Sequence, residues 1–140
     1  REWIVNKSSR AYSLDQNAIS RYRMTVKTGK LSRWPKGEGT DADIYVRLIG
    51  DKGQTNEVEI TSLIPGNALE RGDTDTFTAN FENAIGKVQK IQVRSDMSGV
   101  GPDWYLERID VQPLLGNKDV GENVRFAFNQ WIDSKKVYEK

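Results

Sequence analysis

The stretch YRMTVKT, residues 22–28, decides the fold class because apolar and polar side chains alternate along it. Apolar residues occupy every second position, at Tyr22, Met24 and Val26, and polar residues stand between them. An extended chain directs successive side chains to opposite faces, so this alternation predicts a β-strand that is buried on one side only.

Six further runs show the same period of two. They are IYVRLIG (44–50), EVEI (57–60), TFTANF (76–81), KIQVRS (90–95), WYLERIDVQ (104–112) and VRFAF (124–128). Glycine, proline and asparagine lie between the runs, and no stretch supports a long amphipathic helix. Seven or eight short strands at this spacing predict an all-β protein, an antiparallel β-sandwich of two packed sheets. Trp104 begins one of these runs and Trp131 belongs to the strand-like motif FAFNQWI (126–132), and we expect both in the core.

The organisation predicted along the chain is simple. Residues 21–140 form the sandwich, whereas residues 1–20 lack a steady period and form a lead-in segment or the remnant of a preceding domain. No apolar run approaches the roughly 20 residues of a membrane-spanning helix. We expect this single domain to be monomeric.

Composition narrows the function. The chain has 21 basic and 20 acidic residues, a net charge of +1, so no overall positive field attracts nucleic acid. Histidine and cysteine are both absent, which excludes Ser-His-Asp and Cys-His triads, imidazole or thiolate zinc sites and thiol redox chemistry. Hydrolysis by paired carboxylates, for instance Asp96 with Asp103, stays open as an alternative.

Three turn-forming loops combine carboxylates with apolar residues. They are WPKGEGTDAD (34–43), PGNALERGDTD (65–75) and SDMSGVGPDW (95–104). Calcium prefers six to eight oxygen ligands from carboxylates and backbone carbonyls, and glycine and asparagine let a loop turn its carbonyls inward. The structural alternative is that many of these acidic side chains only stabilise turns, by forming hydrogen bonds with their own backbone. The loops nevertheless predict a calcium site beside an apolar tip.

The order and wording of these segments closely resemble the PLAT (LH2) domain family. The resemblance runs from about Tyr22 to Ile132 and rests on GTDA (39–42), ERGDTDTF (70–77) and GPDWYL (101–106). That family includes domains of lipoxygenases, lipases, polycystins and clostridial alpha-toxin. Membership implies an eight-stranded sandwich of two four-stranded sheets, non-catalytic, which docks its parent protein to membranes or partners. In several members the loops at one end bind calcium.

The resemblance also implies the metal ligands. They are Gly39, Thr40, Asp41, Asn67, Glu70, Asp96 and Asp103. Two departures reduce the number of calcium sites that we expect to one. Some members have an acidic residue at the position of Gly37, and Glu38 could substitute for it. Some members also have an acidic residue at the position of Ala68, directly after the asparagine of the second loop.

The residues expected to contact a membrane lie in or just before the first loop and in the third loop. They are the apolar Trp34, Met97 and Val100 and the basic Lys30, Arg33 and Lys36. Tryptophan favours membrane interfaces, and basic side chains bind anionic head groups. Trp34 could instead stack on a sugar, which leaves a carbohydrate-binding alternative.

The sequence therefore predicts a non-catalytic, calcium-assisted module that docks an attached catalytic or sensory domain to a lipid surface. The main alternative is a protein-interaction module that binds a partner through the same loops or a sheet face. We expect a secreted protein or one peripheral at a membrane surface, with a cytoplasmic location as the alternative.

Overall fold

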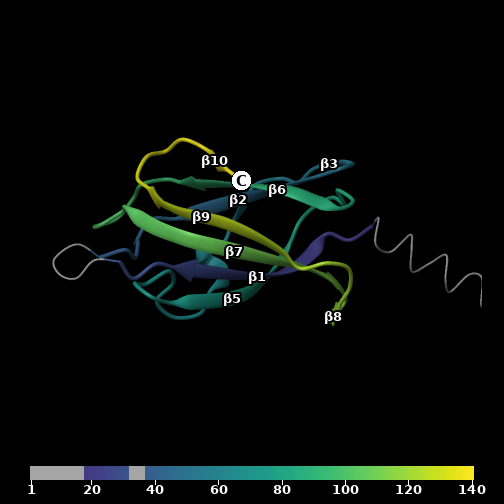
Figure 1. Ribbon diagram of the computed structural model, residues 1–140, viewed down its shortest axis with the longest axis horizontal. Coiled ribbons are helices and arrows are strands. Elements are labelled where there is room, and N and C mark those ends of the chain that lie inside the picture. Colours follow the sequence, from purple (N-terminus) through teal and green to yellow (C-terminus); the bar gives the residue numbers. More distant parts are fainter. Residues whose placement is uncertain (1–17, 32–36) are drawn as a thin grey trace, which may run out of the picture.

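Two antiparallel sheets packed face to face make up the protein (Figure 1). A computed structural model describes residues 18–31 and 37–140. Its long strands are β1 (Arg21–Thr28), β2 (Ile44–Gly50), β5 (Thr74–Asn80), β6 (Val88–Ser95), β7 (Trp104–Leu115) and β9 (Val124–Ile132). Its two-residue strands are β3 (Gly53–Gln54), β4 (Val58–Glu59), β8 (Lys118–Asp119) and β10 (Tyr138–Glu139), and a 3₁₀ helix, η1, covers Thr61–Leu63. The predicted β-sandwich is confirmed.

The first sheet has β1 at its centre. It runs β5-β1-β7-β8, with β9 also paired to β7. Strand β1 alternates half-buried and buried residues along its whole length, as its sequence predicts. Met24 pairs with Phe77 of β5 on one side and with Val111 of β7 on the other, so one register brings three apolar residues to the inner face.

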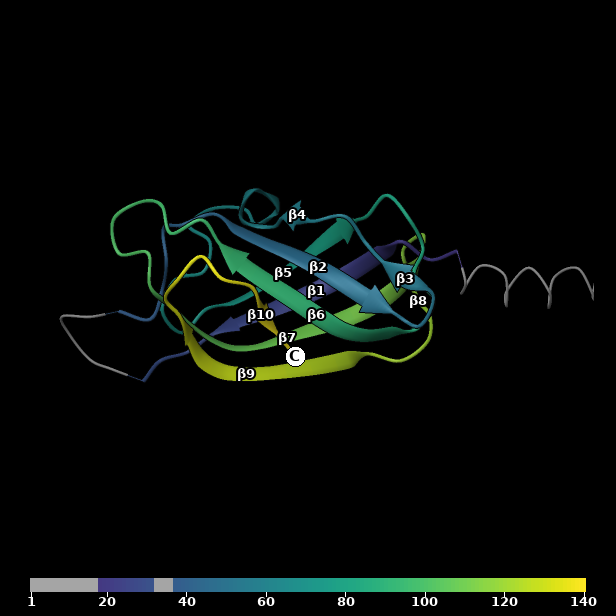
Figure 2. The ribbon, with the colours of Figure 1, turned by 90° about the horizontal axis from the view of Figure 1, so that it is seen from above.

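The second sheet closes the core from the opposite side, as Figure 2 shows. It runs β10-β6-β2-β3, with β4 also paired to β2. Ile44, Val46 and Leu48 of β2 are fully buried, and Val46 and Leu48 pair with the buried Val93 and Ile91 of the neighbouring strand β6. Removing this apolar surface from water is the main source of stability for a sandwich of this kind.

The strand count differs from the expected eight. The described residues form two five-stranded sheets, because four two-residue pairings join the edges of the long strands. Pairings this short carry no alternation of their own in the sequence. Trp104 is fully buried, as expected, and its indole N–H donates to Thr28 Oγ1 at 2.9 Å. Among the described residues, no helix has the length and apolar character needed to cross a bilayer.

Candidate functional site

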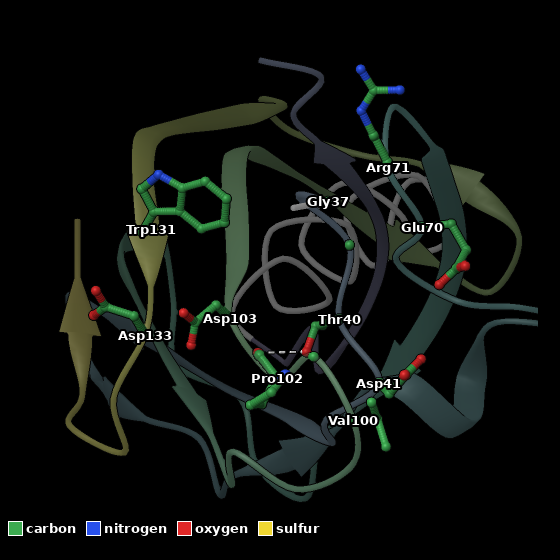
Figure 3. Close-up of a pocket in the computed structure, with 12 residues that line it drawn as sticks. Gly37, Thr40, Asp41, Glu70, Arg71, Val100, Pro102, Asp103, Trp131 and Asp133 are labelled. Carbon is green, nitrogen blue, oxygen red and sulfur yellow. Dashed lines mark hydrogen bonds between the residues drawn. The ribbon is translucent and has the colours of Figure 1, made fainter. Parts of the chain in front are cut away.

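The loops that precede β2, β5 and β7 gather at one end of the sandwich, on the left in Figure 1. Between them lies an open cleft with a volume of about 690 Å³. Its lining includes the four acidic residues Asp41, Glu70, Asp103 and Asp133, the cation Arg71, and the apolar residues Val100 and Trp131. Figure 3 shows Asp41 and Glu70 on one side of the opening, and Asp103 and Asp133 on the other.

The first and second loops touch through their backbones. The Thr40 amide donates to the Leu69 carbonyl oxygen at 3.1 Å. Gly39 has no space for a side chain, because a Cβ there would lie 2.9 Å from the Leu69 oxygen and 3.0 Å from the Glu70 Cα. Glycine is therefore required at this position by close backbone contact, and Asp41 is held near Glu70.

An ion pair between a buried carboxylate and an exposed guanidinium also joins these two loops. The Glu38 side chain is fully buried, and Arg71 Nε donates to its Oε1 at 2.9 Å. The Glu38 backbone carbonyl also accepts a hydrogen bond from the Tyr105 amide at the start of β7. Glu38 thus links the first loop to the second loop and to the start of β7. Glu38 does not line the cleft. It therefore does not replace the acid that other family members have at the position of Gly37.

The third loop rests on the first. Thr40 Oγ1 donates to the Pro102 carbonyl oxygen at 2.6 Å and accepts a hydrogen bond from the Ala42 amide. Gly99 has a positive φ of 81°, and a Cβ on it would lie 3.0 Å from the Asp41 Cβ. The Thr40 hydroxyl therefore stabilises the contact between the two loops. Asp41 packs against Gly99 at the tip of the third loop.

Electrostatic repulsion accompanies this crowding of acids. Glu70 is largely exposed, and the slight burial of its carboxyl group raises its pKa, which the nearby charges of Asp41, Asp73 and Asp75 raise further. Like charges disfavour the ionised form of a carboxyl group until a cation offsets them. Asp41 and Glu70 line the same cleft, and a divalent cation between their carboxylates would offset this repulsion.

The structure brings together most of the predicted metal ligands. Gly39, Thr40, Asp41, Glu70 and Asp103 line the cleft. Asn67 is exposed and outside this lining. Asp96 also lies outside it, where its Oδ1 accepts hydrogen bonds from the Asp43 amide and from the amide and hydroxyl of Ser98. Those bonds, the Ser98 hydroxyl first, lower the pKa of Asp96.

No ready-made cluster of acids is present in the part of the chain that the structure describes. No three acidic side chains there are grouped so as to hold a metal ion by themselves. A cation at this end would therefore need backbone carbonyls and water in addition to Asp41 and Glu70, a mixture that suits calcium.

Comparison with known proteins decides the family. Residues 22–140 match the model of the PLAT/LH2 domain, which is most of the chain. The chain belongs to the PLAT/LH2 family. Domains of this family are membrane- and lipid-associating modules and are typically non-catalytic.

Relatives of this PLAT domain are much longer proteins. Mouse lipoxygenase homology domain-containing protein 1 is 37% identical over 119 residues, which cover 84% of this chain and 5% of the mouse protein. Mouse polycystin family receptor for egg jelly is 38% identical over 97 residues, 69% of this chain and 4% of the receptor. The chain thus spans about a twentieth of the length of these relatives.

Solved structures share the fold. Coral 8R-lipoxygenase, described as activated by calcium through a C2-like domain, matches with a TM-score of 0.66 and 26% identity, over 84% of this chain and 16% of the lipoxygenase. A calcium-dependent 11R-lipoxygenase gives a TM-score of 0.61 and 26% identity, over 85% and 17%. The Clostridium perfringens alpha-toxin gives 0.66 at 23% identity, over 89% and 32%, a likeness in fold alone.

Apolar side chains project beside the cleft of this PLAT domain. Val100 is 87% exposed and Leu31 is 63% exposed. Met97, the other predicted tip residue, is only half-buried, and its amide donates to Ser95 Oγ. Lys30 is exposed and packs beside Gly72 of the second loop. The predicted membrane contacts Trp34, Arg33 and Lys36 lie outside the described residues.

Trp131 is not in the core where the sequence placed it. It is half-buried, lines the cleft, and meets the ring of Tyr105 edge-on, with 5.4 Å between centroids. Alternation along β9 explains the difference, since Phe126, Phe128 and Ile132 are the buried residues of the strand and Trp131 lies out of phase with them, on the other face. Sequence analysis also missed Asp133, because no loop motif marked the residues that follow β9.

Proposed function

We propose that this domain docks an attached protein to the lipid surface of a membrane, peripherally and with the help of calcium. The observation that carries the proposal is one shared location. The acidic cleft and the most exposed large apolar side chain of the described residues, Val100, occupy the same end of the sandwich. Carboxylates repel an anionic lipid surface, so a cation between them would convert this end from repulsive to attractive.

The donor chemistry of the cleft fits calcium. Asp41 and Glu70 line the cleft from two loops and would supply carboxylate oxygens, and Gly39 and Thr40, which also line it, would supply backbone carbonyls. Asp103 faces them across the cleft, as Figure 3 shows. The expected ligands Asn67 and Asp96 would join only if their loops moved, so we centre the site on Asp41 and Glu70. Calcium, when bound, would neutralise charge there.

Calcium at Asp41 would also act on the apolar tip. Gly99 lies against Asp41, and Val100 follows it directly in the chain. A cation on the Asp41 carboxylate would therefore fix the loop that presents Val100 to lipid. Burying a valine or leucine side chain contributes about 1.5–3 kcal/mol, and a basic residue near anionic lipid adds about 1 kcal/mol. Val100, Leu31 and Lys30 together support a weak, reversible contact.

Sedimentation with liposomes tests the proposal. Wild-type domain is mixed with phosphatidylcholine vesicles with or without phosphatidylserine, in millimolar calcium or in EDTA. We expect the bound fraction to rise with calcium. We expect the affinity for vesicles in calcium to be about tenfold weaker in Asp41→Asn and in Asp103→Asn. Glu122→Gln is the matched control, because Glu122 is an exposed acid of the β8–β9 loop that does not line the cleft. Trp34→Ala extends the test to the segment outside the described residues.

Two outcomes contradict the proposal. Vesicle binding that is the same in calcium and in EDTA removes calcium from the function. An absence of binding to any vesicle, together with capture of a defined partner domain that Val100→Asp abolishes, favours the protein-interaction alternative. Both are measured with the folded domain, whose melting curve is recorded in parallel.

A further inference from the structure

Leu69 has an uncommon conformation for its residue type. It is fully buried, yet its φ is +56°, in the left-handed region that favours glycine. A bulky residue in this region persists only where surrounding contacts hold it. Leu69 immediately precedes Glu70, so whatever holds Leu69 also sets the direction of the Glu70 side chain.

Two hydrogen bonds hold the backbone of Leu69. Its amide donates to Asp75 Oδ2 at 3.0 Å, and its carbonyl accepts the Thr40 amide at 3.1 Å. The first bond goes to Asp75, which ends the second loop and belongs to β5, where it pairs with Val26 of β1. The second comes from the first loop. Leu69 is therefore fixed both to the sheet and to the segment that carries Asp41.

Contacts on Glu70 complete this arrangement. The Glu70 carbonyl accepts the Asp73 amide at 2.9 Å, and its Cα lies 3.0 Å from where a Gly39 Cβ would be. Glu70 thus has little backbone freedom as long as Leu69 keeps its conformation. The Asp75 side chain is itself half-buried and is absent from the lining of the cleft.

We propose that Asp75 is a positioning residue: its carboxylate holds Leu69 in the left-handed conformation and so aims Glu70 into the cleft on the same side as Asp41, without itself binding the cation. This inference rests on the proposed function for the role of Glu70. It separates Asp75 from the other acids of the loops, whose effect on a cation would come through charge or direct coordination. The geometry of the hydrogen bond, rather than the negative charge, is what Asp75 supplies.

Three variants distinguish these roles. Asp75→Ala removes the acceptor, Asp75→Asn removes the charge but keeps an oxygen that accepts the Leu69 amide, and Asp73→Asn removes a nearby charge that does not bond to Leu69. Calcium affinity is measured by calorimetry. Exchange of the Leu69 amide proton is measured by NMR in EDTA. The second measurement reports on the hydrogen bond whether or not calcium binds.

We expect Asp75→Ala to speed Leu69 amide exchange and to weaken calcium binding, each about tenfold or more. We expect Asp75→Asn to keep the slow exchange and to bind calcium as Asp73→Asn does. If Asp75→Ala fails to fold, the comparison of Asp75→Asn with Asp73→Asn still decides. The inference is overturned if Asp75→Asn weakens calcium binding well beyond Asp73→Asn, since Asp75 then acts as a ligand, or if Leu69 exchange is the same in all variants.

Failure of the proposed function has a different signature. If calorimetry detects no calcium binding by the wild-type domain, the calcium-assisted function is wrong. Slow exchange of the Leu69 amide that Asp75→Ala abolishes would still establish that Asp75 fixes the conformation of Leu69. If calcium binds and exchange does not respond, the function stands and the positioning role falls.

Discussion

Gly99 of the third loop packs against Asp41 of the first, so closely that a Cβ on Gly99 would lie 3.0 Å from the Asp41 Cβ and 3.1 Å from its carbonyl oxygen. This contact joins the residue at the centre of the proposed calcium site to the neighbour of the most exposed apolar residue at this end, Val100. It predicts that the loop tip and the cation site respond together.

Gly99→Ala tests this coupling. The methyl group would press on Asp41, so we expect calcium and vesicle binding each to weaken about tenfold, which corresponds to roughly 1.4 kcal/mol. Gly101→Ala is the matched control. Gly101 also has a positive φ, of 73°, but no heavy atom lies within 4 Å of its Cβ position. Both variants carry a similar backbone cost, roughly 1–2 kcal/mol, so equal binding losses in the two would contradict the coupling.

The Glu38–Arg71 pair predicts a separable effect on stability. Arg71→Ala leaves the carboxylate of fully buried Glu38 without its guanidinium partner. We expect a loss on the order of 1–3 kcal/mol in the free energy of unfolding, measured by urea denaturation, because a buried charged group loses a hydrogen bond. Adding Glu38→Gln to Arg71→Ala should recover part of the loss. A double variant less stable than the single one would show that Glu38 depends chiefly on other partners.

Much of the fold could be predicted from the sequence because its signal is local. Alternation in residues 22–28 and 44–50 directly specifies which side chains face the core, and both strands are observed there. The two-residue strands are too short to show a period in the sequence: β3 and β8 each pair with the preceding strand across a turn, and β10 pairs with the distant strand β6. Trp131 was misplaced for a different reason, since it is out of phase with the buried residues Phe126, Phe128 and Ile132 of β9 and therefore lies on the other face of the sheet.

The site could be predicted in its residue types but not in their roles. Glu38, Asp75 and Asp96 have the same chemistry as Asp41, and the sequence suggested that Glu38 could replace a ligand. The structure instead pairs Glu38 with Arg71 and bonds Asp75 and Asp96 to backbone amides. Which acid remains in the cleft depends on packing between loop residues that lie 33 and 62 positions apart in the chain. Only the folded arrangement reveals it.

Glu70 predicts how stability depends on pH when calcium is absent. Its pKa in the folded domain is raised above the ordinary value of 4.5, chiefly by burial and then by Asp41. The folded state therefore holds this proton more tightly than the unfolded state does. The contribution of Glu70 to stability is most favourable below about pH 4.5 and declines as the pH rises through the raised folded pKa.

Glu70→Gln removes this titration. In EDTA, we expect the variant to gain stability relative to wild type as the pH is raised from about 4 to about 7, because the wild-type carboxylate becomes charged beside other acids. Urea denaturation at several pH values measures the difference. A difference that stays constant across this range, or that narrows as the pH rises, would show that Glu70 is not under the repulsion described.

Val100 predicts the strength of the membrane contact. Its side chain is 87% exposed at the tip of the third loop, so replacing it changes no packing within the domain. We expect Val100→Ser to leave the melting temperature unchanged and to weaken calcium-dependent binding to vesicles about tenfold, since transferring a valine side chain into lipid contributes about 1.5–3 kcal/mol. Val137→Ser is the control, because Val137 is 50% exposed but does not line the cleft. Equal vesicle binding by wild type and Val100→Ser, with Leu31→Ser also without effect, would show that this end of the domain does not enter the lipid.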